Sequence, residues 1–526
     1  MKRQISSNGF VMPMVLAFII AMTILSAVLL ETISNNFWVV QYNLQRQQAF
    51  NISEAGVNYY LWHLSHNSSD FKDGKSIPAT PDPKLGYGPY VHNYVDSNAV
   101  TQGTYTLWIK PQGNGSTIAT IRSIGNIKGS NITRTVEAKI GAASFASYAL
   151  VADSQLWFGN NETADGPVHS NQGIRMDGAS TNDITSSNQS YVPSSQLGGN
   201  GSTSRPGVWC STTVSSPVNC NTRNKSLWRY PVPAIDFNQV TGSLCIMKKV
   251  AFESDAATAP LASQSTACTK TPNTRTDAYL PQRSTSGSFS STKGYLIELN
   301  ANGTYDLSYV NNENDRTTSY TNALTRQSIA TGVNVPNSGV IFAEDNVWVR
   351  TNGSFHGRVS IAAGRLATTS NASINIVDNL LYSTKNGEDT IGLVAEDSVI
   401  IAPYAPPASS SFNFEVDAAV IAQSGDVVYP NRYKSDSNRC TRGFVNSSQK
   451  FTYYGSIANR QTWTWTWLLG GYSCGDAVRD STNNYVSGIQ TNTTMYDYNL
   501  LYAPPPSFPI TSGYNILSWR EVLALP

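Results

Sequence analysis

Two pairs of adjacent carboxylates have the residue types and spacing to do chemistry. If Glu344-Asp345 and Glu396-Asp397 were stacked in space, they would offer oxygen ligands to Ca²⁺, or an acid and a base to a glycosidic bond. Each pair follows two apolar residues and an alanine. Asp153-Ser154 and Gln423-Ser424 follow the same pattern, so the pattern requires a polar turn and not a carboxylate. We therefore expect solvated turns here and no metal site.

Motifs of the common enzyme classes are absent from the sequence. It contains no Gly-x-Ser-x-Gly, no His-Glu-x-x-His and no phosphate-binding loop. His169 and His356 lie within apolar, strand-like sequence, where a structural role is expected. We predict no catalytic residue and no cofactor.

Three tryptophans alternate with threonines and would share one face of a strand. Exposed, Trp463, Trp465 and Trp467 would form a stacking platform for the sugar rings of surface glycans. Buried, they would close the end of a core. Leu468 and Leu469 follow directly, which favours burial.

Six cysteines occur in the chain, and none lies in its apolar N-terminal segment. An even number in an exported protein favours disulfides, although six thiols allow fifteen pairings. Nearest-neighbour pairing would close the shortest loops. The absence of Cys-x-x-Cys and the scattered histidines argue against zinc. The disulfide candidates are Cys210 with Cys220, Cys245 with Cys268, and Cys440 with Cys474.

The low charge of the chain argues against a nucleic-acid partner. Charged residues make up 13% of the 526 residues and the net charge is +1, so no basic surface for nucleic acid is predicted. A chain of this length requires more than one domain or an elongated repeat structure.

A repeated pattern indicates how the body folds. Leu150–Phe158, Ile341–Val349, Leu393–Ile401 and Val420–Tyr429 share one template, in which a strand ends on alanine, a polar turn follows, and a second strand begins. Short strands at this spacing, with small residues at the corners, predict a parallel β-helix. A β-sandwich is the alternative, because short apolar strands alone do not distinguish the two folds.

Other segments complete the predicted order of elements. Three strands between Gly103 and Gly141 indicate a small antiparallel sheet. Within the stretch that interrupts the repeats, a helix is expected over Phe237–Phe252, and a hairpin around Asn302-Gly303. At the C-terminus, Tyr502–Pro509 is expected to be extended and Ile516–Val522 to be a short docking element.

The N-terminus carries a membrane segment that differs from an ordinary signal peptide. Phe10 to Leu30 is apolar, long enough to cross the ~30 Å hydrocarbon core, and lacks a small-x-small cleavage site. Lys2 and Arg3 precede it, which keeps the leader in the cytoplasm and exports the body. The apolar stripe continues to Trp62, so one helix is expected from about Phe10 to Ser65.

This region resembles the type IV pilin-like proteins, specifically the PilX-type minor pilins. The resemblance rests on the basic leader ending in Gly9, on Phe10 directly after it, on the apolar segment, and on the run Gln45–Val57. It implies that a prepilin peptidase cuts between Gly9 and Phe10 and methylates the new N-terminus. It also implies other pilins in a filament as partners, after passage through the cytoplasmic membrane.

One residue departs from the family pattern. Most pilins have a glutamate at the fifth mature position, where it neutralises a neighbour's N-terminal amine, but here that position is Met14. An amine buried without this partner would be costly within a shaft. By analogy with minor pilins that lack the glutamate, we expect a place at the filament tip.

We therefore expect a mainly β protein and a non-enzymatic subunit of a type IV pilus or related filament, with a β-solenoid displayed at the cell surface for assembly, adhesion or surface contact. The alternatives are a membrane-anchored β-helical polysaccharide hydrolase or lyase, and a static envelope scaffold. The expected parts are a leader (1–9), a membrane and projecting helix (10–65), a small antiparallel region (66–147), a solenoid (148–178 and 336–460), an inserted disulfide-containing subdomain (179–335) and a closing segment (461–526).

Overall fold

The computed structural model forms two compact units, which we describe separately. Unit 1 comprises residues 1–110, 120–140 and 516–526, and unit 2 comprises residues 111–119 and 141–515. The structure describes residues 11–523 apart from 67–69, 76–80, 112–117, 161, 212–219, 255–260, 262–263, 284–289, 315–318, 369, 408, 431–443, 445–446, 462, 469–485 and 490.

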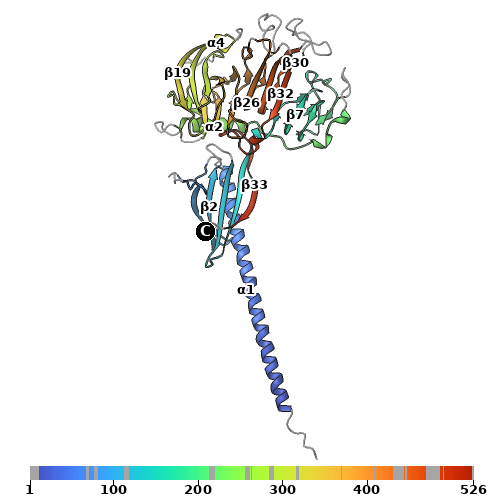
Figure 1. Cartoon of the computed structure of the whole chain (residues 1–526), viewed down its shortest axis with the longest axis vertical. Helices are drawn as coiled ribbons and strands as arrows, with labels where there is room; N and C mark the ends of the chain where they lie inside the picture. The colour runs from blue at the N-terminus through green and yellow to red at the C-terminus, as the bar shows by residue number, and fades with distance from the viewer. Residues whose placement is uncertain are drawn as a thin grey trace, which may run out of the picture. The chain divides into compact units, whose positions relative to one another are not determined.

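Unit 1 begins with one uninterrupted helix, α1 (Val11–His66), drawn as a single blue coil in Figure 1. Its 56 residues span ~84 Å at 1.5 Å per residue. Within α1 no glycine occurs before Gly56, and Pro13 lies in the first turn, where the missing N–H does no harm. Every residue from 11 to 40 is exposed, and the helix is long and apolar enough to cross a membrane.

The second half of α1 packs on a five-stranded sheet. Ile52, Tyr60 and Leu64 are at most 3% exposed in this interface. The central strands agree with the sheet predicted between Gly103 and Gly141. The first strand was not predicted, and the last contains the segment Ile516–Val522 that was expected to dock. The strand order is β1 (Tyr87–Val95), β2 (Thr101–Pro111), β3 (Ile118–Ile127), β4 (Thr133–Ser144) and β33 (Ile510–Val522).

Glycines allow the helix and the sheet of unit 1 to approach closely. A Cβ on Gly56 would lie 2.2 Å from the Ser123 hydroxyl oxygen, and one on Gly125 would lie 2.1 Å from the Ala49 carbonyl oxygen. Both distances are below van der Waals contact, so side chains at these positions would push α1 off the sheet.

Unit 2 is a solenoid of parallel strands, which confirms the mainly β prediction and excludes the sandwich. Strand β32 (Thr491–Tyr496) pairs in parallel with β28 (Gln449–Asn459) of the main sheet. The main sheet has the order β15 (Trp228–Arg229), β11 (Ile184–Ser186), β8 (Val168–Ser170), β5 (Leu150–Ala152), β28 (Gln449–Asn459), β26 (Phe412–Ala422), β24 (Thr390–Ala395), β22 (Arg358–Ala363), β20 (Val340–Ala343) and β16 (Tyr279–Leu280).

Two further sheets form a second face of the coils. One has the order β19 (Leu324–Asn334), β18 (Thr304–Glu313), β17 (Gly294–Asn300), β21 (Asn346–Asn352), β23 (Ile374–Ile376), β25 (Val399–Ile401), β27 (Val427–Val428) and β29 (Trp463–Thr464). The other has the order β14 (Val208–Trp209), β9 (Ile174–Met176) and β6 (Leu156–Phe158).

Each copy of the repeated sequence forms the strand, turn and strand that the template predicts. The first strand of each copy enters the main sheet and the second enters the other face. Three template alanines lie in one row at the corner, because they and Ala363 of the coil between them are register partners in successive coils: Ala343, Ala363, Ala395 and Ala422.

The order of the coils differs from the order of the chain. The first coils of the chain run from β5, in the middle of the main sheet, to β15 at one end of it. The later coils run from β16, at the other end, back to β28 in the middle. The last coil therefore lies on the first, with β28 parallel to β5. All the pairs along the main path are parallel, so the stack is one solenoid whose sequence is circularly permuted.

Much of the region between the repeats belongs to the same sheets. Within 179–335, β11, β14 and β15 extend one end of the stack, and β17 pairs in parallel with β21. The hairpin β17–β18 turns at Gly303 (φ 77°), and α2 (Gln239–Phe252) is the predicted helix. A second helix, α3 (Gln264–Thr269), follows α2.

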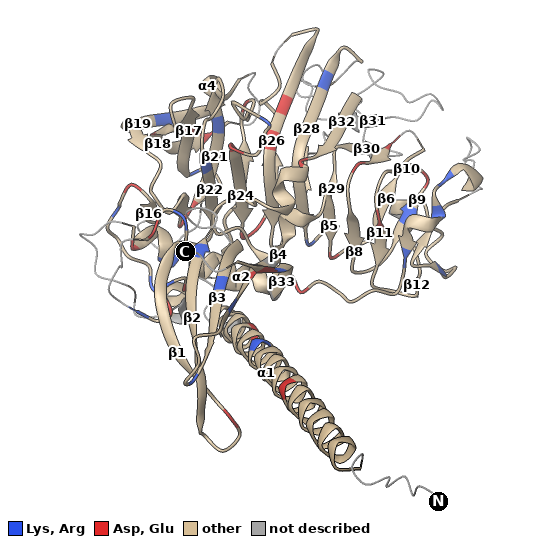
Figure 2. Ribbon diagram, turned by 60° about the horizontal axis from the view of Figure 1, so that its bottom comes forward, with Lys and Arg blue, Asp and Glu red and all other residues tan. Residues whose placement is uncertain are grey.

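Unit 2 has two apolar cores. The first fills the inside of the coils and includes Leu393, Val420 and Ile457. The second lies on the outer face of the main sheet, where Leu244 and Met247 of α2 cover Ala362 and Val394. Figure 2 shows few charged positions along the strands of the main sheet, as the low fraction of charged residues in the sequence predicts.

Candidate functional site

The corner of the coils carries the carboxylate pairs. Each corner residue donates its backbone N–H to the coil before it, for example Glu396 N to Ala363 O at 2.9 Å and Gln423 N to Ala395 O at 2.9 Å. Because each coil repeats this bond, the side chains that follow the alanines form a row along the stack.

The solvated turns expected for Glu344-Asp345 and Glu396-Asp397 were a wrong prediction for most of these side chains. Glu344 is 1% exposed, Asp345 is 0% exposed and Glu396 is 9% exposed. Buried carboxylates require cations or hydrogen-bond donors, and here those come from distant parts of the chain.

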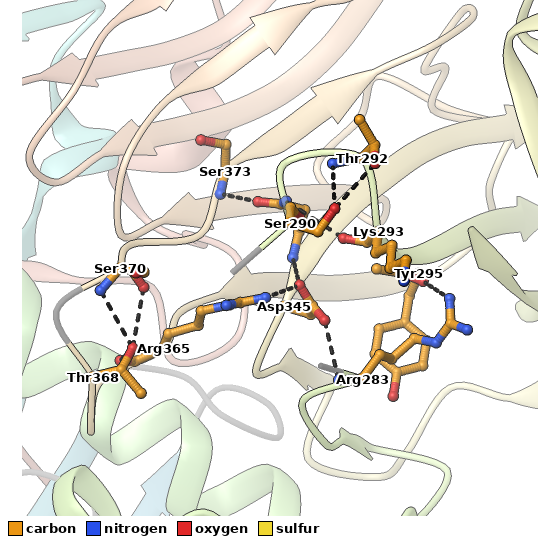
Figure 3. Close-up of polar contacts among 12 residues, drawn as sticks. Arg283, Ser290, Thr292, Lys293, Tyr295, Asp345, Arg365, Thr368, Ser370 and Ser373 are labelled. Atoms are coloured by element: carbon orange, nitrogen blue, oxygen red, sulfur yellow. Dashed lines mark hydrogen bonds and ion pairs between the residues drawn. The ribbon is translucent and has the colours of Figure 1, made fainter. Parts of the chain in front are cut away.

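Asp345 is enclosed by donors from three segments. Its carboxylate forms an ion pair with Arg365 of the next coil and accepts the backbone N–H of Arg283 at 3.1 Å and that of Asn346 at 2.9 Å. Figure 3 shows the Arg365 side chain extended toward Asp345. Arg365 is itself only 2% exposed. This pair therefore joins two coils in the interior.

Glu344 is held by the helix that covers the sheet. It forms an ion pair with Lys248 of α2, whose side chain is fully buried, and accepts a hydrogen bond from the Tyr279 hydroxyl at 2.7 Å. Burial raises the pKa of Glu344 above its usual value, although Lys248 opposes the shift. The pair fixes α2 to the coil through two charges that water does not reach.

The second carboxylate pair is held by hydrogen-bond donors of neighbouring segments. The Arg365 backbone N–H donates to Glu396 at 2.6 Å, and the Ser373 hydroxyl donates to Asp397 at 3.2 Å. Burial raises the pKa of Glu396. Bonds of this kind connect neighbouring coils and leave little carboxylate for a ligand.

The structure gives no metal centre within the part of the chain that it describes. No three His, Cys, Asp or Glu side chains come together there in a group that could hold an ion.

A second polar cluster, which the sequence did not reveal, lies on the outer face of β26. Asp417 is 1% exposed and pairs with Lys385 at 2.9 Å, while Glu415 pairs with the same lysine at 2.6 Å. The Lys385 ammonium lies 4.5 Å from the centre of the Tyr454 ring. Burial outweighs the lysine and raises the pKa of Asp417 to about 6. The register of β26 on β28 places Tyr454 opposite Asp417, and Lys385 reaches them from the loop before β24.

A buried arginine stack was also not predicted. Arg175 is 2% exposed and forms an ion pair with Asp177 at 2.7 Å. Its guanidinium lies 4.4 Å from the ring centre of Trp157 and 5.4 Å from that of Trp209. The same guanidinium donates a hydrogen bond to the Gly198 carbonyl oxygen at 2.7 Å, so an acid, two rings and a backbone oxygen together hold the buried charge.

The tryptophan repeat lies largely inside the protein at the two side chains that the structure describes, in line with the favoured burial and not with an exposed platform. Trp465 is 5% exposed, and its ring centre lies 5.1 Å from that of Phe451. Trp463 is half-buried against Phe158, with ring centres 5.6 Å apart. The side chain of Trp467 lies outside what the structure describes. These contacts place two of the rings against the core of the coils.

Two disulfides join neighbouring cysteines. Cys210 bonds to Cys220, and Cys245 of α2 bonds to Cys268 of α3. Cys440 and Cys474 lie outside the described residues, as do Gly9 and Phe10 of the predicted cleavage site.

No protein-family model matches the chain, and no curated protein matches it in sequence. Among solved structures, the crystal structure of the competence-associated pilin ComZ from Thermus thermophilus is similar to it over 91% of this chain and 98% of that one, with 13% identity and a TM-score of 0.27. A TM-score this low does not define a shared fold.

Proposed function

We propose that the protein is a non-enzymatic, pilin-like subunit of a type IV pilus or related filament. Helix α1 carries the proposal. It is exposed from residue 11 to residue 40 and carries no charge from residue 11 to residue 30, and its second half packs on a sheet. A plain membrane anchor does not need a helix that continues without a break into the folded head. A filament subunit needs such a helix, because the apolar half leaves the membrane to pack against its neighbours.

Met14 supports a place at or near the tip of the filament. Its side chain is 69% exposed and offers no charge to a neighbouring subunit's amine. With the solenoid displayed there, the chain would serve assembly, adhesion or surface contact. The proposed topology is a cytoplasmic leader, one membrane span and an extracytoplasmic body.

The environment of the carboxylates gives no support to a polysaccharide-cleaving enzyme. Asp345 is held by Arg365 and Glu344 by Lys248, so neither is free to protonate a leaving group or to activate water. We therefore propose a non-enzymatic function for the protein.

Mass spectrometry of the N-terminus of the purified membrane protein tests the proposal. A pilin-like subunit begins at a methylated Phe10, and Gly9→Ala leaves it uncut. An intact Met1 in the wild-type protein would contradict processing and favour a static envelope scaffold.

Incorporation is tested separately on sheared and purified filaments. We expect this chain in the filament fraction at far lower amount than the main subunit, as a tip position requires. An even distribution along the shaft, seen with gold-labelled antibody, would contradict the tip assignment and leave the filament assignment in place.

A further inference from the structure

The five-stranded sheet of unit 1 ends in a strand whose outer edge has no neighbour among the described residues. β33 is 13 residues long and pairs only with β4. Its side chains Ile516, Leu517 and Trp519 are 41%, 49% and 42% exposed. An edge of this length that carries apolar side chains is a template for another strand.

The two edges of the sheet differ in protection. At the opposite edge, β1 contains Pro89, which has no N–H to donate, and its pairing with β2 is irregular near Tyr87 and again near Val95. β33 has no proline. Its two charged residues are already engaged: Arg520 binds Glu137 at 2.5 Å and Glu521 binds Arg134. The features that normally keep strands away are present at β1 and missing at β33.

A shallow groove runs beside β33. It is lined by Glu54, Val57 and Asn58 of α1 together with Ile516 and Trp519 of β33, and its volume is about 200 Å³. Val57, 1% exposed, forms its apolar base, and the Trp519 ring packs edge-on against Phe50 of α1. The volume is below the ~300–1,000 Å³ of small-molecule pockets and suits one or two side chains.

We propose that β33 and this groove bind an extended segment of another polypeptide by strand addition. The segment pairs its backbone with β33, places apolar side chains at alternate positions against Val57 and Trp519, and directs a lysine or arginine to Glu54. This requires only the folded unit 1 and not cleavage of the leader.

A second copy of this chain is the poorer occupant. Its β1 edge is guarded, and the basic residue on its β33, Arg520, is bound to Glu137 and not free for Glu54. Charge complementarity with Glu54 therefore favours a different chain with a free basic residue.

The test uses the full-length protein in detergent micelles and a fluorescent peptide, Thr-Val-Lys-Val-Thr-Val-Lys-Val-Thr. Saturable binding below 1 mM is expected by fluorescence anisotropy. Two further peptides are N-methylated on the backbone, one at its odd-numbered residues and the other at its even-numbered residues. One of them should lose binding and the other should keep it, because only alternate N–H groups face β33. Equal binding by the two methylated peptides, or no saturable binding of the unmethylated peptide up to 1 mM, would overturn strand addition at this edge.

Variants locate the peptide on the protein. Ile516→Lys should weaken binding about tenfold or more by placing a charge in the apolar groove, whereas Trp62→Ala, an exposed change on α1 outside the groove, should not. Glu54→Lys should weaken binding of the lysine peptide, and the variant should bind a peptide with glutamate in place of lysine. Loss of a dimer on Ile516→Lys in sedimentation would overturn the proposal in favour of a second copy.

Discussion

Asn459 of the last coil is the register partner of Ala152 of the first coil, although most of unit 2 separates them in sequence. On its other side, Asn459 is the register partner of Ala422. The corner row thus holds a buried amide where its neighbours hold methyl groups. Asn459 is 0% exposed, and neither polar atom of its side chain has a partner among the described residues.

Asn459→Ala is expected to stabilise the protein. The substitution extends the alanine row and removes an amide whose burial without hydrogen bonds costs about 1–3 kcal/mol. The free energy of unfolding from urea titration should rise. The matched control is Ala422→Asn, which buries an amide one coil away and should lower it. A loss of stability in Asn459→Ala would show that the amide is hydrogen-bonded.

Removing Lys248 should destabilise unit 2 strongly. Lys248→Met leaves Glu344 buried without its cation, a change that costs about 3–5 kcal/mol in comparable pairs. The double variant Lys248→Met/Glu344→Gln removes both charges and should recover most of that loss. A double-mutant cycle on unfolding free energies measures the coupling, and additive effects would contradict a coupled pair.

Replacing Gly125 or Gly56 with alanine should weaken the packing of α1 on the sheet, and the two substitutions should differ in cost. Gly125→Ala places its Cβ against backbone atoms of Ala49 and Ser53, which cannot rotate away, and should cost about 1–3 kcal/mol. Gly56→Ala meets the Ser123 hydroxyl first, so adding Ser123→Gly should relieve part of its cost. Thermal unfolding of these three variants and the wild-type protein compares them. Equal melting temperatures for Gly125→Ala and wild type would contradict the close approach.

Asp417 should make stability fall as the pH rises. Its pKa is raised from 3.8 to about 6 in the folded state, so the folded protein binds the proton more tightly than the unfolded chain between these values. The stabilisation is therefore present at pH 4 and is lost by about pH 7. Measured against Asp417→Asn, which does not titrate, the wild-type protein should lose stability across this window. A difference that is constant from pH 4 to pH 7 would contradict the shift.

The sequence predicts the local structure of the coils better than their order. The template at Leu393–Ile401 specifies a strand, a turn and a strand, because alternation and an alanine corner are local properties. The contact of β28 with β5 has no local signal, since coils with apolar inner faces can stack equally well in several orders. The partner of Glu344 escaped prediction for the same reason, because Lys248 is on a helix that covers the sheet from outside.

The permuted order determines how the solenoid bears a mechanical load. The chain enters unit 2 near Phe145 and leaves it near Pro509, and these two residues are joined by an N–H···O=C bond of 3.0 Å. The outermost strands, β15 and β16, are both internal in sequence. Tension applied to the two ends of this unit therefore falls first on the Phe145–Pro509 junction beside the middle of the stack. The outer coils lie off the line of force and keep their hydrogen bonds while the junction is strained.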